Sequence, residues 1–315
     1  MSQINNPHDK YFKRTMRKKA NAVSLFKAYL SSKIKKQLDF KTLSIVKDSF
    51  VSKELQERFS DIVYKVSGQD EEFFIFMFLE HQSTVDKWMH VRFMGYMKEF
   101  YDFYIEQHPK IEKLPGSIPI LFYHGKQPWN VSVHSWDIIQ HPEAINKFIP
   151  KFDYKLLDFS LNSTLKIKGN IVLQLFLKIM KTIKSSQFKD EFIKIVPLFV
   201  KLSNQKTGMG YIMLTLKYLF ETSSLKPTDI EKKLLPVIEK EKRGAIMTLG
   251  EQFEKRGEER GEKRGEIKGT IKTLQEFVNM GIFTKEFVAK RIDECNQKLK
   301  ELALSNNSVD GFQKT

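Results

Sequence analysis

Cysteine is almost absent from this sequence, which contains only Cys295. A lone cysteine excludes an intramolecular disulfide and a zinc site built from several cysteines. Long apolar runs are also missing, because the apolar stretch at residues 73–79 is far shorter than the ~20 residues that span a bilayer. The first residues, MSQINNPHDKYFK, contain no apolar segment of the kind found in secretory signals. We therefore expect a cytoplasmic protein without a membrane-spanning segment.

Positive charge is in excess over the 315 residues of the chain. Lys and Arg number 53 against 38 Asp and Glu, which gives a formal net charge of +15. This excess favours a polyanionic partner such as DNA, RNA or an anionic membrane surface, although a well-solvated lysine-rich surface has the same composition. The hydrophobic fraction of 41% allows a sizeable core, in one large domain or two smaller ones.

Residues 60–83 have the pattern of a β-hairpin. A run rich in Ile, Val and Tyr leads to a polar turn around residues 68–71, and a nearly continuous apolar run follows. This second run ends abruptly in Glu80, His81 and Gln82. Because side chains alternate along a strand, Glu80 and Gln82 share one face and His81 points to the other.

The length of the turn decides which residue lies opposite Asp61, at the start of the first strand. A two-residue loop at residues 70–71 places Asp61 opposite Glu80, and a four-residue loop places it opposite Phe78. Either register gathers Asp61, Glu80 and Gln82. Two carboxylates and an amide form the oxygen-rich set that Mg²⁺ prefers when a phosphate supplies the remaining ligands. The alternative is a pair of structural strand-end acids.

Asp9 offers a third carboxylate. Asn6 and Pro7 precede it, and apolar residues then recur at helical spacing, so Asp9 is expected in the first turn of a helix. The simplest role there is a helix cap or a partner of the helix dipole. The functional alternative is a third acid directed at the metal site.

Basic and histidine side chains near the hairpin are candidates for contacts with DNA. The basic candidates lie on the first predicted helix and near the start of a helix predicted over residues 84–107; they are Lys13, Arg14, Lys87, His90 and Arg92. A solvated surface is the commoner role for any one of them. His81 and His124 are candidates for DNA contact or leaving-group protonation, and a structural role is the simpler alternative for each.

The elements around the hairpin predict an α/β fold. Short strands are expected at residues 43–50 and 117–125, and the helix over 84–107 carries a broad apolar stripe. The second hairpin strand is apolar on both faces, so helices must cover both sides of the sheet. We predict a mixed sheet flanked by helices.

Beyond the sheet, the pattern predicts an all-α C-terminal region without further strands. We expect a core over residues 1–130, a helical lobe over 131–242, a charged tail over 243–303 and a disordered end over 304–315. The tail repeats Gly every four residues, at Gly257, Gly261, Gly265 and Gly269, between rows of basic residues and glutamates. Each Gly costs a helix about 0.8–1 kcal/mol relative to Ala. A frayed solvated helix and a close-packed helical pairing, which would make a homo-oligomer, are therefore both open.

Taken in order, these segments resemble the Rpn family of recombination-promoting nucleases, also described as transposases, within the PD-(D/E)xK nuclease superfamily. The matching segments are HDKYFK (8–13), KDSFVSKEL (47–55), SDIVYKV (60–66), FLEHQST (78–84), DKWMHVRFMGYM (86–97) and IPILFYHGKQPW (118–129). The KRGEERGEKRGE array (255–266) also resembles tails common in that family. The resemblance spans nearly the whole chain and is strongest over residues 6–130.

The resemblance implies a restriction-endonuclease-like core with the metal site on the central hairpin. Asp61 then takes the role of the first acid, Glu80 that of the second, and Gln82 the place of a lysine. Asp9 matches an acid that related nucleases carry on the first helix. A lysine can hold a hydroxide or help to deprotonate water, whereas an amide can only orient it. The metal must therefore contribute more of the catalysis, and a glutamine also occurs at this place in some restriction enzymes.

We therefore predict a DNA endonuclease of low sequence specificity, dependent on Mg²⁺ or another divalent cation, that promotes recombination or mobile-element movement. Asp61 and Glu80 would ligate the metal, Asp9 would add a ligand, and Gln82 would position the attacking water. The alternatives are a non-catalytic DNA-binding or assembly protein and RNA cleavage by the same site. A DDE-type transposase is disfavoured because its three acids are spread over a different fold. A serine-nucleophile mechanism is also disfavoured, because no serine lies in a G-x-S-x-G elbow.

Overall fold

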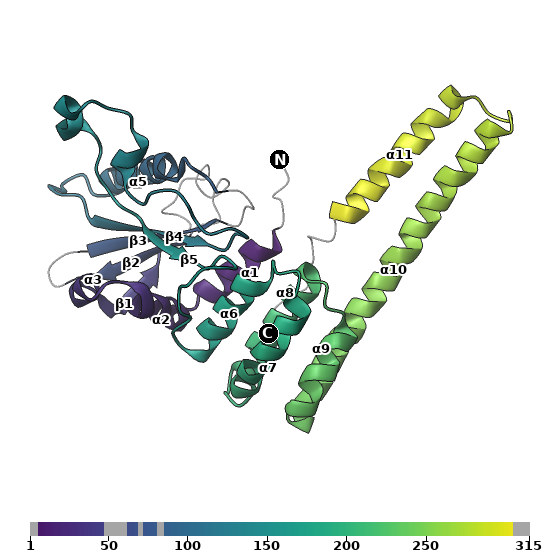
Figure 1. The fold of residues 1–315 in the computed structure, drawn as a ribbon, viewed down its shortest axis with the longest axis horizontal. Coiled ribbons are helices and arrows are strands. Elements are labelled where there is room, and N and C mark those ends of the chain that lie inside the picture. Colours follow the sequence, from purple (N-terminus) through teal and green to yellow (C-terminus); the bar gives the residue numbers. More distant parts are fainter. Residues whose placement is uncertain (1–5, 47–61, 69–71, 81–84, 305–315) are drawn as a thin grey trace. The chain divides into compact units, whose positions relative to one another are not determined.

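The computed structural model describes residues 6–46, 62–68, 72–80 and 85–304. The chain divides into two compact units (Figure 1). The sheet unit comprises His8–Gln205, and the tail unit comprises Lys206–Thr315 together with Met1–Pro7.

Five strands form one mixed sheet in the order β1-β2-β3-β4-β5. Their bounds are β1 Asp39–Ile45, β2 Ile62–Ser67, β3 Glu72–Glu80, β4 Gly116–Tyr123 and β5 Lys155–Asp158. β2 is antiparallel to both β1 and β3, while β3, β4 and β5 run parallel. The start of β2 and the end of β3 therefore lie at the same edge of the sheet.

The hairpin of β2 and β3 confirms the prediction for its described residues and selects one register. Ile62 pairs with Met77, and Ser67 pairs with Glu72. Four residues separate Ser67 from Glu72 in the chain, so the four-residue alternative holds and the two-residue alternative is wrong.

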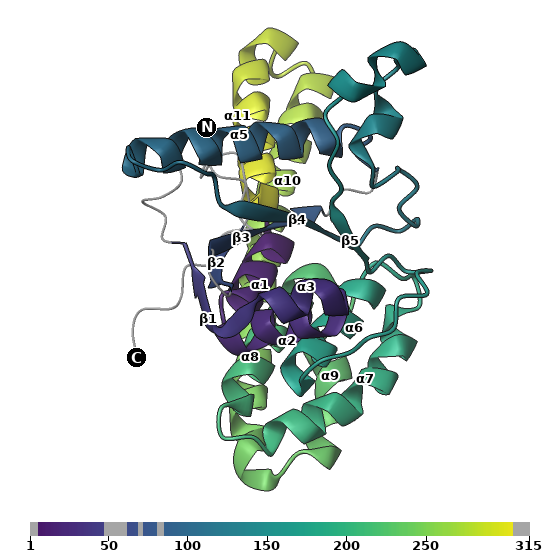
Figure 2. The ribbon, with the colours of Figure 1, turned by 90° about the vertical axis from the view of Figure 1, so that its left-hand side faces the viewer.

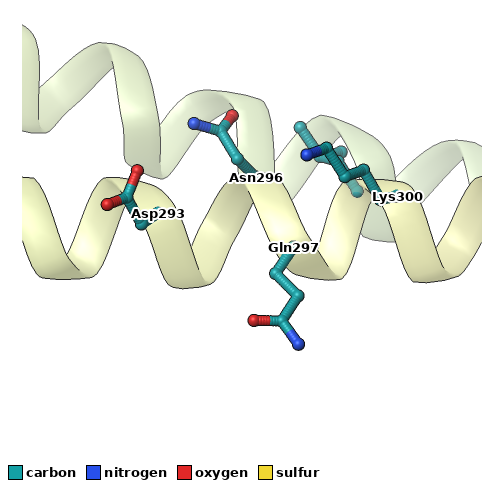
Figure 3. Close-up of a pocket in the computed structure, with 5 residues that line it drawn as sticks. Asp293, Asn296, Gln297 and Lys300 are labelled. Atoms are coloured by element: carbon teal, nitrogen blue, oxygen red, sulfur yellow. The ribbon is translucent and has the colours of Figure 1, made fainter.

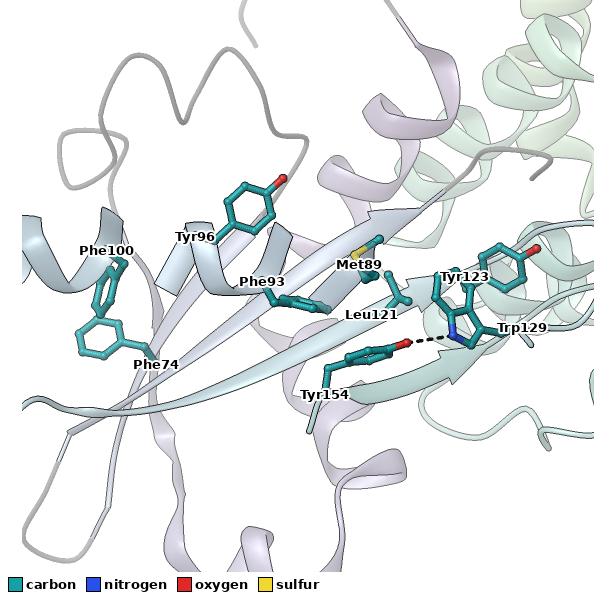
Figure 4. Packing of buried hydrophobic residues seen from close by; sticks show 9 residues of the cluster. All are labelled: Phe74, Met89, Phe93, Tyr96, Phe100, Leu121, Tyr123, Trp129 and Tyr154. Carbon is teal, nitrogen blue, oxygen red and sulfur yellow. Dashed lines mark hydrogen bonds between the residues drawn. The ribbon is translucent and has the colours of Figure 1, made fainter. Parts of the chain in front are cut away.

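One face of the sheet is covered by α5 (Met89–Gln107), whose predicted apolar stripe is confirmed. The ring centroids of Phe74 on β3 and Phe100 on α5 lie 4.6 Å apart, and those of Phe93 and Tyr154 lie 5.2 Å apart. Figure 4 shows this cluster between the helix and the sheet. Burial of these large aromatic side chains, each worth roughly 1.5–3 kcal/mol, holds α5 against the strands.

The opposite face is covered by three helices, α1 (Pro7–Met16), α2 (Lys19–Tyr29) and α6 (Ile171–Thr182) (Figure 2). The ring of Phe12 on α1 lies 5.3 Å from Phe122 on β4, and Phe176 on α6 lies 5.7 Å from the same ring. Tyr64 on β2 donates a hydrogen bond to the Met16 carbonyl. The sheet is thus buried on both faces, as its apolar central strand requires.

The remaining elements of the sheet unit are short or peripheral. They are α3 Ser32–Gln37, the 3₁₀ turns η2 Ser135–Ile138 and η3 Glu143–Phe148, and α7 Phe188–Ser203. α7 packs against α6. Asn170 caps α6, because its side chain accepts a hydrogen bond from the Leu173 amide.

Two predictions of secondary structure need correction. The segment beyond residue 134 is not purely helical, because β5 pairs in parallel with β4 and extends the sheet. β1 begins at Asp39 rather than at residue 43, and residues 47–50 of the predicted strand lie outside the described residues.

The tail unit consists of helices in its described part. They are α8 Gly208–Thr222, α9 Pro227–Leu234, the 3₁₀ turn η4 Leu235–Val237, α10 Lys240–Asn279 and α11 Lys285–Leu304. α10 contacts α8, α9 and α11. Among the described helices, none combines the length and apolarity that a bilayer crossing demands.

Candidate functional site at the edge of the sheet

The carboxyl ends of β3, β4 and β5 lie at one edge of the sheet, because these strands are parallel. β3 ends at Glu80, whose backbone is in register with Tyr123 at the end of β4. Ile62, which directly follows Asp61 in the sequence, begins β2 at the same edge. Ligands in open α/β sheets bind outside the carboxyl ends of the strands, so this edge is the candidate site.

The start of α1 reaches the same edge. The ring of His8 lies 5.4 Å from the ring of His124, the residue that follows β4. Pro7 is the first residue of the helix, a position where its missing N–H costs nothing. Asp9 follows in the first turn, beside the end of β4.

Asp9 has one carboxylate oxygen engaged and one without a partner among the described residues. Its Oδ2 lies 3.3 Å from the Lys13 ammonium, one helical turn away. Its Oδ1 is buried and accepts no hydrogen bond from any described residue. A buried carboxylate oxygen without a donor is costly, and a divalent cation would satisfy it. Asp9 therefore fits the ligand role proposed for it, and a helix cap alone leaves its Oδ1 unexplained.

The loop after β4 is fixed by a close approach of backbone to Tyr123. The Tyr123 hydroxyl donates to the Gln127 carbonyl at 2.9 Å, across Gly125. A Cβ at Gly125 would lie 1.8 Å from the Tyr123 Oη, so only glycine fits there. This turn holds His124, which is buried, at the edge of the sheet.

Asp158 at the end of β5 secures the same loop from the other side. Its carboxylate accepts hydrogen bonds from the Trp129 amide at 3.1 Å and from the Ser160 amide at 2.8 Å. Trp129 is buried and donates through Nε1 to the Tyr154 hydroxyl at 2.9 Å (Figure 4). Burial raises the pKa of Tyr154 to about 12, so this hydroxyl stays protonated. Trp129 is therefore a packing residue under the sheet edge.

The predicted hairpin site is only partly within the described structure. Asp61, His81 and Gln82 lie outside the described residues, and for Glu80 only the backbone is described. Within the described part of the chain, no three His, Cys, Asp or Glu side chains form a group suited to a metal ion. The convergence of Asp61, Glu80 and Asp9 on one metal remains a prediction.

The basic candidates occupy different settings. Lys13 pairs with Asp9, and Arg92 pairs with Asp86 at 3.1 Å. Arg14 is exposed. Lys87 is also exposed, with its ammonium 5.1 Å from the Trp88 ring centroid. Their contacts with DNA remain predictions.

His90 is a correction to the set of basic candidates. Its side chain is fully buried, and its ring lies 4.9 Å from the ring of Tyr154. Burial lowers the pKa of His90 below its ordinary value. It cannot reach a phosphate from this position and serves the core instead.

His8 is the residue at this edge that the sequence interpretation missed. It immediately precedes Asp9, and a histidine next to a candidate ligand was the available signal. Its contact with His124 is tertiary, because α1 and β4 are distant in the chain.

A surface hollow on α11 offers no comparable chemistry. It is lined by residues of that helix alone, namely Asp293, Asn296, Gln297, Leu299 and Lys300 (Figure 3). A single carboxylate on one exposed helix face does not provide the ligand set of a metal site.

Comparisons with known proteins agree on one family. Residues 6–209 match the model of a family described as "Putative transposase, YhgA-like". The match spans the sheet unit from α1 to α7 and includes the edge described above. No solved structure matches the chain.

Several curated proteins of Escherichia coli (strain K12) are similar to this chain. Recombination-promoting nuclease RpnC is 24% identical over 253 residues, which cover 80% of this chain and 82% of that protein. The inactive recombination-promoting nuclease-like protein RpnE is 24% identical over 257 residues, covering 81% and 84%. Recombination-promoting nuclease RpnA is 31% identical over 142 residues, covering 45% and 48%.

Proposed function

Since the chain belongs to the family described as "Putative transposase, YhgA-like", which its match over residues 6–209 establishes, we propose that it is a metal-dependent DNA endonuclease. The observation that carries this proposal is the buried, unpartnered Oδ1 of Asp9 among the described residues, at the edge where β3 ends in Glu80. Relatives named as recombination-promoting nucleases support the reaction class.

The proposed site takes one acid from each of three segments. Asp9 comes from the first turn of α1, Glu80 from the end of β3, and Asp61 from the position before β2. The start of β2 and the end of β3 lie at the edge where the ring of His8, the residue before Asp9, lies 5.4 Å from the ring of His124. A hard cation such as Mg²⁺ is the group that three carboxylates and a phosphate oxygen would hold.

Mg²⁺ bound there would lower the pKa of a water and offset negative charge on the phosphoryl group. The chain's own residues then have distinct tasks. Gln82 orients the attacking water through its amide, because it can neither carry charge nor accept a proton at neutral pH. Lys13 offsets the charge of Asp9 through its ion pair with Oδ2 at 3.3 Å, which would leave Oδ1 for the cation.

Low sequence specificity is the expected mode of DNA recognition. Arg14 and Lys87 are exposed cations, suited to phosphates that every sequence shares. The net charge of +15 supports a polyanionic substrate. Recombination or mobile-element movement is the proposed biological setting, in line with the name of the family and that of RpnC.

Nicking of supercoiled plasmid tests the proposal. The full chain is incubated with Mg²⁺, with Ca²⁺ and with a chelator, beside the variants Asp61→Ala and Glu80→Ala. We expect the wild type to nick the plasmid with Mg²⁺ and not with Ca²⁺ or the chelator. The nicking rate of each variant with Mg²⁺ should be at least about a hundredfold lower. Undiminished nicking by both variants would reject the assignment of these acids.

A non-catalytic DNA-binding protein is the second candidate. RpnE, which is named an inactive nuclease-like protein, has the same 24% identity to this chain as RpnC. Gln82 also stands where the superfamily pattern has a lysine. This candidate predicts salt-dependent DNA affinity without cleavage under any divalent cation. Affinity with no nicking in Mg²⁺ or Mn²⁺ would favour it over the endonuclease.

A further inference from the structure

The long helix α10 carries a glycine face that no described residue covers. A Cβ built at Gly257, Gly261, Gly265 or Gly269 meets nothing within 4 Å. All four positions are exposed. α11 packs on a different side of α10, where Ile267 and Ile271 are half-buried.

This face is unfavourable in a helix that stands alone. Glycine is a poorer helix former than alanine, so the four glycines weaken this helix. The basic row Arg256, Arg260, Arg264 and Lys268 and the acidic row Glu258, Glu262 and Glu266 also place like charges four residues apart. Like charges at this spacing repel along a helix.

Each glycine has a basic residue before it and, at three of the four positions, a glutamate after it. Successive residues lie about 100° apart around a helix. The basic row and the acidic row therefore run along opposite flanks of the glycine face. The face thus has one positive and one negative border.

We propose that α10 pairs with α10 of a second copy of this chain through the glycine face, with the two helices parallel. A two-fold axis along parallel helices sets the basic flank of each against the acidic flank of the other. An antiparallel pair would set basic against basic and acidic against acidic. The rows that repel within one helix thus attract across the parallel pair.

The glycines set how closely the helices approach. Rows of residues at four-residue spacing pack into one another at a crossing angle of about −50°. Without side chains at these positions the two backbones come near, which brings the flanking charges within reach. A polyanion such as DNA does not fit this face, because glutamates border it beside three of its four glycines.

The oligomeric state of the full chain tests the pairing, with sedimentation equilibrium as the measurement. The double variant Gly261→Ala and Gly265→Ala is compared with Gly244→Ala, which lies on the same helix with nothing within 4 Å. Alanine strengthens the helix in both. We expect a dimer in the wild type and the control, and at least about tenfold weaker association in the double variant. A monomeric wild type, or equal association in all three proteins, would overturn the proposal.

Cross-linking with a short bismaleimide tests the orientation. The variants Gly257→Cys and Gly269→Cys are treated separately and as a mixture, with the wild type as control because its one cysteine, Cys295, is buried. In a parallel pair each variant cross-links to itself. In an antiparallel pair equal positions lie about 18 Å apart along the helix, so only the mixture reacts. Cross-links confined to the mixture would overturn the parallel arrangement.

Discussion

At the residue scale, substitution of Asp9 can distinguish a role in helix stability from a role in metal-dependent nicking. A carboxylate in the first turn stabilises a helix by about 0.3–1 kcal/mol. Asp9→Asn keeps the shape of the side chain and removes its charge, so we expect Mg²⁺-dependent nicking to fall at least about tenfold with little change in melting temperature. Nicking kinetics and thermal melting measure the two effects.

Lys13→Gln is the matched control for Asp9→Asn. It removes the ion pair at 3.3 Å and leaves the carboxylate in place. If the Asp9–Lys13 ion pair only stabilises the helix, both variants will change the melting temperature alike and leave nicking intact. That result would contradict our account. If Asp9 is a ligand, Lys13→Gln will retain far more activity than Asp9→Asn.

His90 gives a pH dependence that can be worked out in sign. Burial lowers its pKa below the ordinary 6.5, so the unfolded chain binds this proton more readily than the folded chain. The contribution of His90 to the unfolding free energy is therefore fully present above about pH 6.5. As the pH decreases below that value, the unfolding free energy decreases by at most about 1.4 kcal/mol per pH unit. Urea denaturation between pH 5 and 7 should show that His90→Phe flattens this loss.

His134 is the control for the pH experiment. A hydrogen bond from its ring to the Asp153 carboxylate raises its pKa, and it is exposed on the surface. Its contribution has the opposite sign, since it is present below pH 6.5 and lost as the pH rises. His134→Gln should therefore leave the acid-side loss in place. An unchanged pH profile in His90→Phe would contradict the burial argument.

At the element scale, the turn after β4 depends on one glycine. Gly125→Ala would force its Cβ against the Tyr123 ring, whose Cζ would lie 2.2 Å away. We expect a loss of roughly 1–3 kcal/mol in unfolding free energy, because the loop or the ring must shift. Urea denaturation measures this loss. Gly95→Ala on α5, where a Cβ meets nothing within 4 Å, should be neutral or stabilising, and equal effects of the two changes would contradict the account.

Elements with a strong periodic pattern were predictable from the sequence. The hairpin follows from two apolar runs around a polar turn and α5 from its apolar stripe, which local chemistry determines. β5 was missed because its four residues, KLLD, carry no pattern of their own and pair only through β4. The helix α10 also continues without a break through its glycines, although the helix propensity of glycine disfavours this.

At the scale of the whole molecule, the site was predictable only in part. The acids of the hairpin followed from an abrupt change of polarity, and the resemblance to known nucleases assigned their roles. The contact of His8 with His124 and the unpartnered oxygen of Asp9 among the described residues depend on how α1 packs on the sheet. Tertiary packing of that kind leaves no local signal in the sequence.

The most direct test of the account is the rate of Mg²⁺-dependent plasmid nicking in two variants of the same strand. Glu80→Gln changes the last residue of β3, at the proposed site, and Glu72→Gln changes the first residue, which pairs with Lys65 at the opposite end. We predict a loss of at least about a hundredfold in Glu80→Gln and a nearly unchanged rate in Glu72→Gln. Equal nicking by the two proteins, or none by the wild type with any divalent cation, would contradict the account.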